Sequence, residues 1–147
     1  MKSRPNAGFT LIELLIVVAI IGIIAAIAIP NLLNAIDRGK QKRTMADLRT
    51  IGTAMEQYAV DNNVYPTASD AASLAPTVQP TYVKLMPQND GWSYTFQVDS
   101  TSSAYTLWSF GKDGTGTTCD PLLTNSFAEQ ICFVNGQFLR YPQGTQQ

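Results

Sequence analysis

The chain has 147 residues, of which 45% are hydrophobic and only 14% are charged, and it contains no histidine. The lack of histidine excludes Ser-His-Asp and Cys-His catalysis and every His-ligated metal site. A formal net charge of −1 gives no indication of a nucleic-acid-binding domain. We therefore expect a protein that is not an enzyme and that has no nucleic-acid partner.

The hydrophobic residues are concentrated near the N-terminus, directly after a short basic leader. Residues 1–8 (MKSRPNAG) contain two basic residues and no acid, and residues 9–29 are interrupted in their apolar character only by Thr10 and Glu13. A helix of this length is about 31 Å long, which matches a hydrocarbon core of about 30 Å. The positive-inside rule keeps the leader cytoplasmic and sends everything after Pro30 across the membrane.

The helical pattern continues past Pro30 and becomes amphipathic. It predicts one long helix over about residues 10–60, weakened at Gly22, Pro30 and Gly39. Residues 37–43 are polar all round, so we expect them to lie between the membrane-embedded half and the half that packs on a domain. The apolar positions of that second half recur at spacings of three and four: Leu48, Ile51, Met55 and Tyr58.

The rest of the chain has the pattern of a small β domain. Residues 67–91 read as a loop-rich connection with a short helix near residues 70–74. Residues 92–98 and 104–110 are rich in aromatic and β-branched residues and predict a hairpin. A second hairpin is predicted around Asn135-Gly136, because both residues of such a tight turn need a positive φ. The fold class is α+β, with a long N-terminal helix packed on a small antiparallel sheet.

The segment Gly8-Phe9-Thr10-Leu11-Ile12-Glu13 resembles the class III signal of type IV pilins and type II secretion pseudopilins. In that family a prepilin peptidase cuts after the glycine and methylates the new N-terminal amine, which the resemblance assigns to Gly8 and Phe9. The resemblance also implies an inner-membrane assembly platform as partner, a helical homo-oligomeric filament as product, and the type IV pilin fold.

The implied organisation of the chain has four parts. Residues 1–8 form a cleaved leader, residues 9–30 a transmembrane and filament-core helix, residues 31–62 an amphipathic helix, and residues 63–147 a globular β domain.

Glu13 is the unusual residue of the hydrophobic segment. A carboxylate at the centre of a membrane-spanning helix costs about 2.5–3.5 kcal/mol on insertion scales, and a shallow position lowers that cost. One interpretation is that the side chain simply reaches the headgroup region. The resemblance implies instead that Glu13 pairs with the charged amine of Phe9 on a neighbouring subunit, which favours correct register because the buried charge needs its partner.

Two further features concern the same helix. Ala26-Ile27-Ala28 has the small-x-small pattern of an ordinary secretory signal cut after Ala28, an alternative that would release a soluble protein. Pro30 removes an amide donor and disturbs the helix. In the family, the matching stretch before the proline can lose helicity in assembled filaments, which carries over to residues 22–29 here.

The resemblance extends into the globular part at Asn63-Val64-Tyr65-Pro66, Asp90-Gly91-Trp92 and residues 109–114 (SFGKDG). In the major pseudopilin of type II secretion, the loop after the last of these motifs binds calcium through aspartates and backbone carbonyls. The matching candidates are Asp113, Asp120 and Glu129. The alternative is a β-turn with solvated carboxylates, because Cys119 precedes Asp120 and the usual paired acids are replaced by Glu129-Gln130. No other cofactor is expected.

Cys119 and Cys132 are the only cysteines of the chain. In an oxidising extracytoplasmic compartment, a pair that closes a loop of about 14 residues is expected to form a disulfide worth roughly 3 kcal/mol in the chain-entropy model. Such a bond could pin the irregular loop to the final hairpin, as calcium does in the pseudopilin. The alternative is two free thiols.

The favoured function is therefore a structural subunit of a type IV-like filament, and the disulfide inclines the choice to a type IV pilin. The main alternative is the major pseudopilin of a type II secretion system. A different class of protein, a single-pass membrane-anchored extracytoplasmic binding domain, remains a further alternative. The expected location is the inner membrane for the precursor, followed by an extracellular pilus or a periplasmic pseudopilus.

Overall fold

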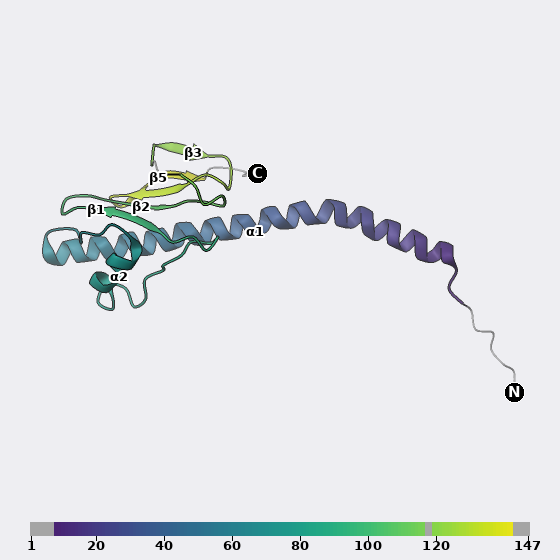
Figure 1. Cartoon of the computed structure of the whole chain (residues 1–147), viewed down its shortest axis with the longest axis horizontal. Helices are drawn as coiled ribbons and strands as arrows, with labels where there is room; N and C mark the ends of the chain where they lie inside the picture. Colours follow the sequence, from purple (N-terminus) through teal and green to yellow (C-terminus); the bar gives the residue numbers. More distant parts are fainter. Residues whose placement is uncertain (1–7, 117–118, 143–147) are drawn as a thin grey trace, which may run out of the picture. The chain divides into compact units, whose positions relative to one another are not determined.

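The computed structural model describes residues 8–116 and 119–142. The chain divides into two compact units, Met1–Ala35 and Ile36–Gln147, and the long helix α1, Leu11–Asn62, contributes to both. In Figure 1, α1 is coloured from purple near its N-terminus to teal at its end, and the other elements of the second unit follow in teal to yellow.

The described part of the first unit is helical from Leu11 onward, and nearly all of its side chains are exposed. Its mean hydropathy reaches 3.1 over an 18-residue window, so by length and composition the helix could cross a membrane. Gly22 and Pro30 both keep helical conformation. Because proline lacks an amide hydrogen, the carbonyl of Ala26 loses its helical donor. In the next position, the side-chain amide of Asn31 adds a hydrogen bond to the carbonyl of Ile27, at 3.1 Å.

Asn63 ends α1. Its φ of 61° lies in the left-handed region, which asparagine adopts more readily than most residues, and its amide donates to the carbonyl of Ala59 at 2.8 Å. The short helix α2, Ala71–Val78, follows. Asp70 and Ser73 form a capping box at its start. The short helix expected near residues 70–74 is therefore present and longer than predicted.

Within the described residues, five strands form one sheet in the order β1-β2-β4-β5-β3. Neighbouring strands are antiparallel except β3 and β5, which are parallel. Figure 1 shows the sheet in green to yellow beside the second half of α1. The strands are β1, Gln97–Ser100; β2, Tyr105–Ser109; β3, Leu122–Thr124; β4, Ile131–Val134; and β5, Gln137–Pro142.

The core of the second unit lies between α1, α2 and the sheet. The apolar stripe of α1 faces inward as its spacing predicts. Gly52 leaves room for the ring of Phe133, with which an added Cβ would overlap. The buried core residues are Leu48, Ile51, Ala54, Met55, Ala71, Leu74, Val78, Met86, Phe96, Val98, Tyr105, Leu107, Ile131 and Phe133.

The carboxylate of Glu56 is held between two tyrosines of this unit. Tyr105 and Tyr65 donate their hydroxyl groups to the two oxygens of Glu56, at 2.9 Å and 3.1 Å. Burial, followed by the bond to Glu56, raises the pKa of Tyr105 well above its ordinary value. Both oxygens of Glu56 are therefore satisfied inside its own subunit.

The sequence predicted most of this architecture correctly. The α+β class, the long helix with its small sheet, and the hairpin at Asn135-Gly136 are confirmed, and both turn residues have positive φ values of 45° and 85°. The helix extends two residues beyond the predicted end. The parallel strand β3 was not predicted.

Two other expectations were wrong. Residues 92–96 form mainly a turn instead of the first part of a strand, because both Trp92 and Tyr94 donate their amides to the carboxylate of Asp90, at 2.9 Å each. Within the polar residues 37–43, one side of the helix already packs on the domain, since Asp37 and Gln41 are only 6% and 4% exposed.

Candidate functional site

The candidate processing and assembly residues lie at the start of the first unit. Gly8 and Phe9 precede α1, and Phe9 is 80% exposed. An added Cβ at Gly8 would meet nothing within 4 Å. No neighbour in the described chain therefore requires glycine at this position. Any requirement for glycine would have to come from a protein that binds this segment.

Glu13 is engaged by its own helix terminus. The backbone amide and the hydroxyl of Thr10 donate to Glu13 Oε2 at 2.8 Å and 2.7 Å, and the Thr10 hydroxyl oxygen accepts from the Glu13 amide at 3.3 Å. This is the reciprocal pattern of a capping box, and the sequence Thr-Leu-Ile-Glu carries its Thr-x-x-Glu signature. The sequence reasoning singled out Glu13 and missed Thr10, although that signature could have found it.

Within the part of the chain that the structure describes, the carboxylate of Glu13 nevertheless lacks a counter-charge. Among residues 8–116 and 119–142, no Lys or Arg nitrogen lies within 4.0 Å of it. It is exposed on an otherwise apolar helix. Within the described residues, Thr10 therefore engages one carboxylate oxygen of Glu13, and the charge is left without a cation.

In the second unit, two of the motifs that carried the resemblance meet against α1. Ser109 donates its hydroxyl to Asp90 Oδ2 at 2.5 Å, and the amide of Gly111 donates to the Ser109 oxygen at 3.2 Å. The amide of Gly91 donates to the hydroxyl of Thr44 on α1 at 2.9 Å. The Asp90-Gly91-Trp92 turn and the SFGKDG segment thus fix the sheet to the helix.

Asp37 on α1 contacts the same two motifs through Lys112 and Trp92. Lys112 Nζ lies 2.7 Å from Asp37 Oδ2, and the indole nitrogen of Trp92 donates to Oδ1 at 3.2 Å. Burial pushes the pKa of Asp37 upward, but the hydrogen bonds from Lys112 and Trp92 and the nearby lysines outweigh it, so this pKa lies below its ordinary value. The ion pair ties the SFGKDG segment to the helix.

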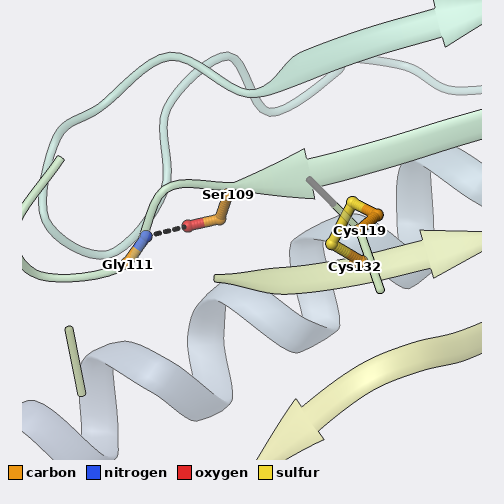
Figure 2. Close-up of a disulfide and its surroundings, with 4 residues drawn as sticks. All are labelled: Ser109, Gly111, Cys119 and Cys132. Carbon is orange, nitrogen blue, oxygen red and sulfur yellow. Dashed lines mark hydrogen bonds between the residues drawn. A yellow bond between two sulfur atoms is a disulfide. The ribbon is translucent and has the colours of Figure 1, made fainter. Parts of the chain in front are cut away.

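Cys119 and Cys132 form the predicted disulfide, with a Cα–Cα distance of 5.7 Å. Figure 2 shows the bond beside β4, with the hydrogen bond from Gly111 to Ser109 at the end of β2. Cys132 is fully buried. The bond attaches the chain before β3 to the centre of the sheet.

The three calcium candidates are not gathered into one cluster. Asp113 and Glu129 line the same cavity, whereas Asp120 is exposed outside its lining. Asp113 accepts a hydrogen bond from the amide of Thr115 at 3.0 Å. Arg140 Nη2 lies 3.9 Å from Glu129 Oε2 and so already offsets its charge.

No group of three or more Cys, Asp or Glu residues that could hold a metal ion occurs in the described part of the chain. Calcium requires six to eight oxygen ligands. This donor set does not fit a calcium site as it stands, and calcium binding stays a prediction that only a binding measurement can test.

Two known sequence families match successive parts of the chain. The prokaryotic N-terminal methylation motif matches residues 3–29, and the family described as type II secretion system (T2SS), protein G, matches residues 31–121. The first match covers Gly8, Phe9 and Glu13. The second covers the turn and the SFGKDG segment that meet against α1.

Individual relatives agree with these matches. The type II secretion system core protein G of Aeromonas hydrophila is 33% identical over 135 residues, which cover 83% of this chain and 94% of the relative. The protein of the same name from Vibrio cholerae is 34% identical over 129 residues, which cover 77% and 87%. That of Pseudomonas aeruginosa is 33% identical over 127 residues, which cover 78% and 89%. The chain is a member of the type II secretion system protein G family.

Proposed function

We propose that this chain is a structural subunit of a type II secretion pseudopilus. In this proposal a prepilin peptidase cuts after Gly8 and methylates Phe9, the helix of residues 9–30 holds the subunit in the inner membrane, and subunits then assemble into a periplasmic filament through that helix. The observation that carries the proposal is the exposed apolar surface of α1 in the first unit, which bears one carboxylate and no counter-charge.

Such a surface needs a cover, and lipid or the same helices of other subunits can supply it. Among the described residues, Thr10 donates the hydrogen bonds that Glu13 accepts. Cleavage after Gly8 would create a positively charged amine on Phe9. When helices pack against one another, the amine of one subunit can offset the carboxylate of the next, and a misplaced subunit would leave both charges unpaired in an apolar surrounding.

The proposed filament is a pseudopilus, whereas the disulfide alone favoured a type IV pilus. The relatives are named core protein G of type II secretion systems, so they support the pseudopilin alternative better than the type IV pilin. The SFGKDG segment, which contributes to the junction with α1, lies within the family match. A C-terminal disulfide was a weaker guide because it reports on the compartment and the loop, and both kinds of filament are extracytoplasmic.

We also propose that the chain has no enzymatic activity. Its sequence lacks histidine, and the serine closest to a buried carboxylate, Ser109, uses that contact to fix the junction with α1. Ser109 is itself fully buried, so it cannot meet a substrate.

The first test follows the processing of the protein. Intact mass of the subunit extracted from membranes should give a chain that begins at a methylated Phe9. The Gly8→Leu variant should keep its leader and remain in the membrane. The matched variant Gly22→Leu, whose position is also open to solvent, should be processed normally. A mature chain that begins at Ile29 would support the ordinary secretory signal and contradict the proposal.

The second test separates the two kinds of filament. In the native host, deletion of the gene should abolish the release of exported proteins into the medium and leave surface fibres unchanged. If surface fibres disappear and export continues, the subunit belongs to a pilus.

A further inference from the structure

The long loop between β2 and β4 contains the short strand β3, and its two ends lie next to each other. The amide of Lys112 donates to the carbonyl of Phe127 at 2.8 Å. Gly111 has a φ of +78°, and an added Cβ would lie 2.5 Å from the carbonyl oxygen of Glu129. The two ends of the loop are therefore held side by side by backbone contacts, and the residues between them need further attachments.

The disulfide is one such attachment. Cys119 lies before β3, and its partner Cys132 lies on β4, fully buried. Since β3 pairs in parallel with β5 and with no other strand of the described sheet, the covalent bond anchors the loop to the sheet interior just before its edge strand.

The Glu129–Arg140 pair is the second attachment. Arg140 lies on β5 and its side chain is only 16% exposed, while that of Glu129 is 31% exposed. Glu129 Oε1 also accepts from the amide of Asn125 at 3.4 Å. An ion pair at this degree of burial is screened less by solvent than one on the open surface.

The cavity beside this pair is lined by the carboxylates of Asp113 and Glu129 and also by the cation of Arg140. It measures about 240 Å³. Among the described residues, Gln130 Nε2 and Arg140 Nε are buried N–H groups without an acceptor. Amide and guanidinium N–H groups only donate, and the positive charge of Arg140 repels a divalent ion. The cavity is lined by Asp113, Thr115, Gly116, Ala128, Glu129, Gln130 and Arg140.

We propose that the Cys119–Cys132 disulfide and the Glu129–Arg140 ion pair hold this loop in place of a bound cation, so that the folded domain neither binds calcium nor needs it. The inference concerns the stability of the second unit and does not rest on filament assembly. A subunit that failed to assemble could still confirm it.

Thermal unfolding of the full chain in detergent tests this directly. The midpoint of the oxidised protein should agree within about one degree in millimolar calcium and in excess chelator. The Cys119→Ser, Cys132→Ser double variant should unfold about ten degrees lower or more, and calcium should not restore it. Arg140→Gln should lose a few degrees, and the matched variant Arg38→Gln, whose arginine is exposed and outside any ion pair of the described residues, should lose none.

If the double variant does not fold, hydrogen exchange on the folded wild-type protein replaces it. Reduction of the disulfide should speed exchange of the Lys112 amide, which reports whether the loop remains closed, at least tenfold with or without calcium. A midpoint that rises by several degrees in calcium, or stoichiometric calcium binding by calorimetric titration, would overturn the proposal. Unchanged midpoints in both variants would overturn it as well, because the two attachments would then not hold the loop.

Discussion

The two units treat apolar surface and charge in opposite ways. In the first unit, large aliphatic residues such as Ile12 and Ile23 are each 64% exposed, whereas in the second Leu48 and Ile51 are fully buried. Their carboxylates differ in the same way. Glu56 is enclosed by two tyrosine hydroxyls of its own subunit, and Glu13 only caps its own helix and has no counter-charge among the described residues.

This difference indicates which interactions each unit completes by itself. The second unit encloses an apolar core and pairs the buried Asp37 within one chain, so substitutions there should change stability first. In the proposed filament, lipid or other subunits would do this for the first unit, so substitutions there should change assembly without changing the unfolding of the second unit. The following predictions test that separation.

The largest effect is expected at Glu13. Replacement by Leu removes the charge that a neighbouring amine would meet, and insertion into the membrane becomes easier, not harder. We therefore expect normal membrane levels, an unchanged unfolding midpoint, and complete loss of filaments by electron microscopy of cells that overproduce the subunit. The control is Asn31→Leu, a polar-to-apolar change on the same helix, where the asparagine side chain donates to the carbonyl of Ile27. Filaments of Glu13→Leu subunits at wild-type abundance would refute the role assigned to this carboxylate.

The next effect concerns the contact of the Asp90-Gly91-Trp92 turn with α1. An added Cβ at Gly91 would lie 2.5 Å from the carbonyl oxygen of Lys40. A backbone atom of a helix cannot easily move away, so Gly91→Ala should reduce the free energy of unfolding by about 1–3 kcal/mol. Gly39→Ala is the matched control, because nothing lies within 4 Å of its added Cβ and it should stabilise the helix by about 0.5–1 kcal/mol. Urea titration of both variants should give shifts of opposite sign; equal shifts would mean that the close approach is not maintained in solution.

The Asp90-Gly91-Trp92 turn is a part of the fold that the sequence did not predict. Hydrophobic spacing and the Asn135-Gly136 turn were sufficient for α1 and the last hairpin, since both signals are local. The first strand was placed too early because the carboxylate of Asp90 shapes the chain as a turn, and that carboxylate is held by Ser109, which lies 19 residues away. Strand β3 is three residues long, too short for an alternating pattern to register, and its parallel pairing depends on a distant segment.

The candidate site residues also differ in whether a local sequence signal or only a contact between distant residues identifies them. Gly8, Phe9 and Glu13 lie within a few residues of one another, so a local motif was enough to select them. The contact between Asp37 and Lys112 joins residues 75 positions apart, and no local pattern announced it. Calcium ligands were transferred from a resemblance residue by residue, but the position of Arg140 beside Glu129 could be known only from the folded structure.

The ion pair of Asp37 should have a moderate effect. Lys112→Met keeps most of the side-chain length and leaves the buried carboxylate with Trp92 as its remaining side-chain donor. The expected loss is about 1–2 kcal/mol of unfolding free energy, reduced by the partial exposure of the lysine. Lys84→Met, at an exposed lysine outside the ion pairs of the described residues, should change stability by less than about 0.5 kcal/mol. Equal losses in the two variants would show that the pair contributes nothing specific.

The pKa of Asp37 makes this contribution dependent on pH. Because its pKa in the folded state is depressed below 3.8, the ionised group stabilises the fold fully above the ordinary aspartate range. That stabilisation is lost as the pH falls through the folded-state pKa. The difference in unfolding free energy between the wild type and Asp37→Asn should therefore shrink toward strongly acidic pH, measured by urea titration at a series of pH values. A difference that stays constant across the series would contradict the depressed pKa.

The smallest effect is expected at Thr10, where the two tasks of Glu13 can be separated. Thr10→Val keeps the shape of the side chain and the charge of Glu13 but removes the hydroxyl that both donates to the carboxylate and accepts from the Glu13 amide. Loss of a cap of this kind costs about 1 kcal/mol, so the Glu13 amide should exchange its hydrogen roughly fivefold faster. Filaments should still form, because the charge is retained. Thr50→Val is the control, since the Thr50 hydroxyl donates to the carbonyl of Ala46 in the middle of α1 and caps no terminus. If Thr10→Val abolishes filaments as completely as Glu13→Leu, the hydroxyl of Thr10 is itself required for assembly, and the charge of Glu13 alone does not explain why subunits join.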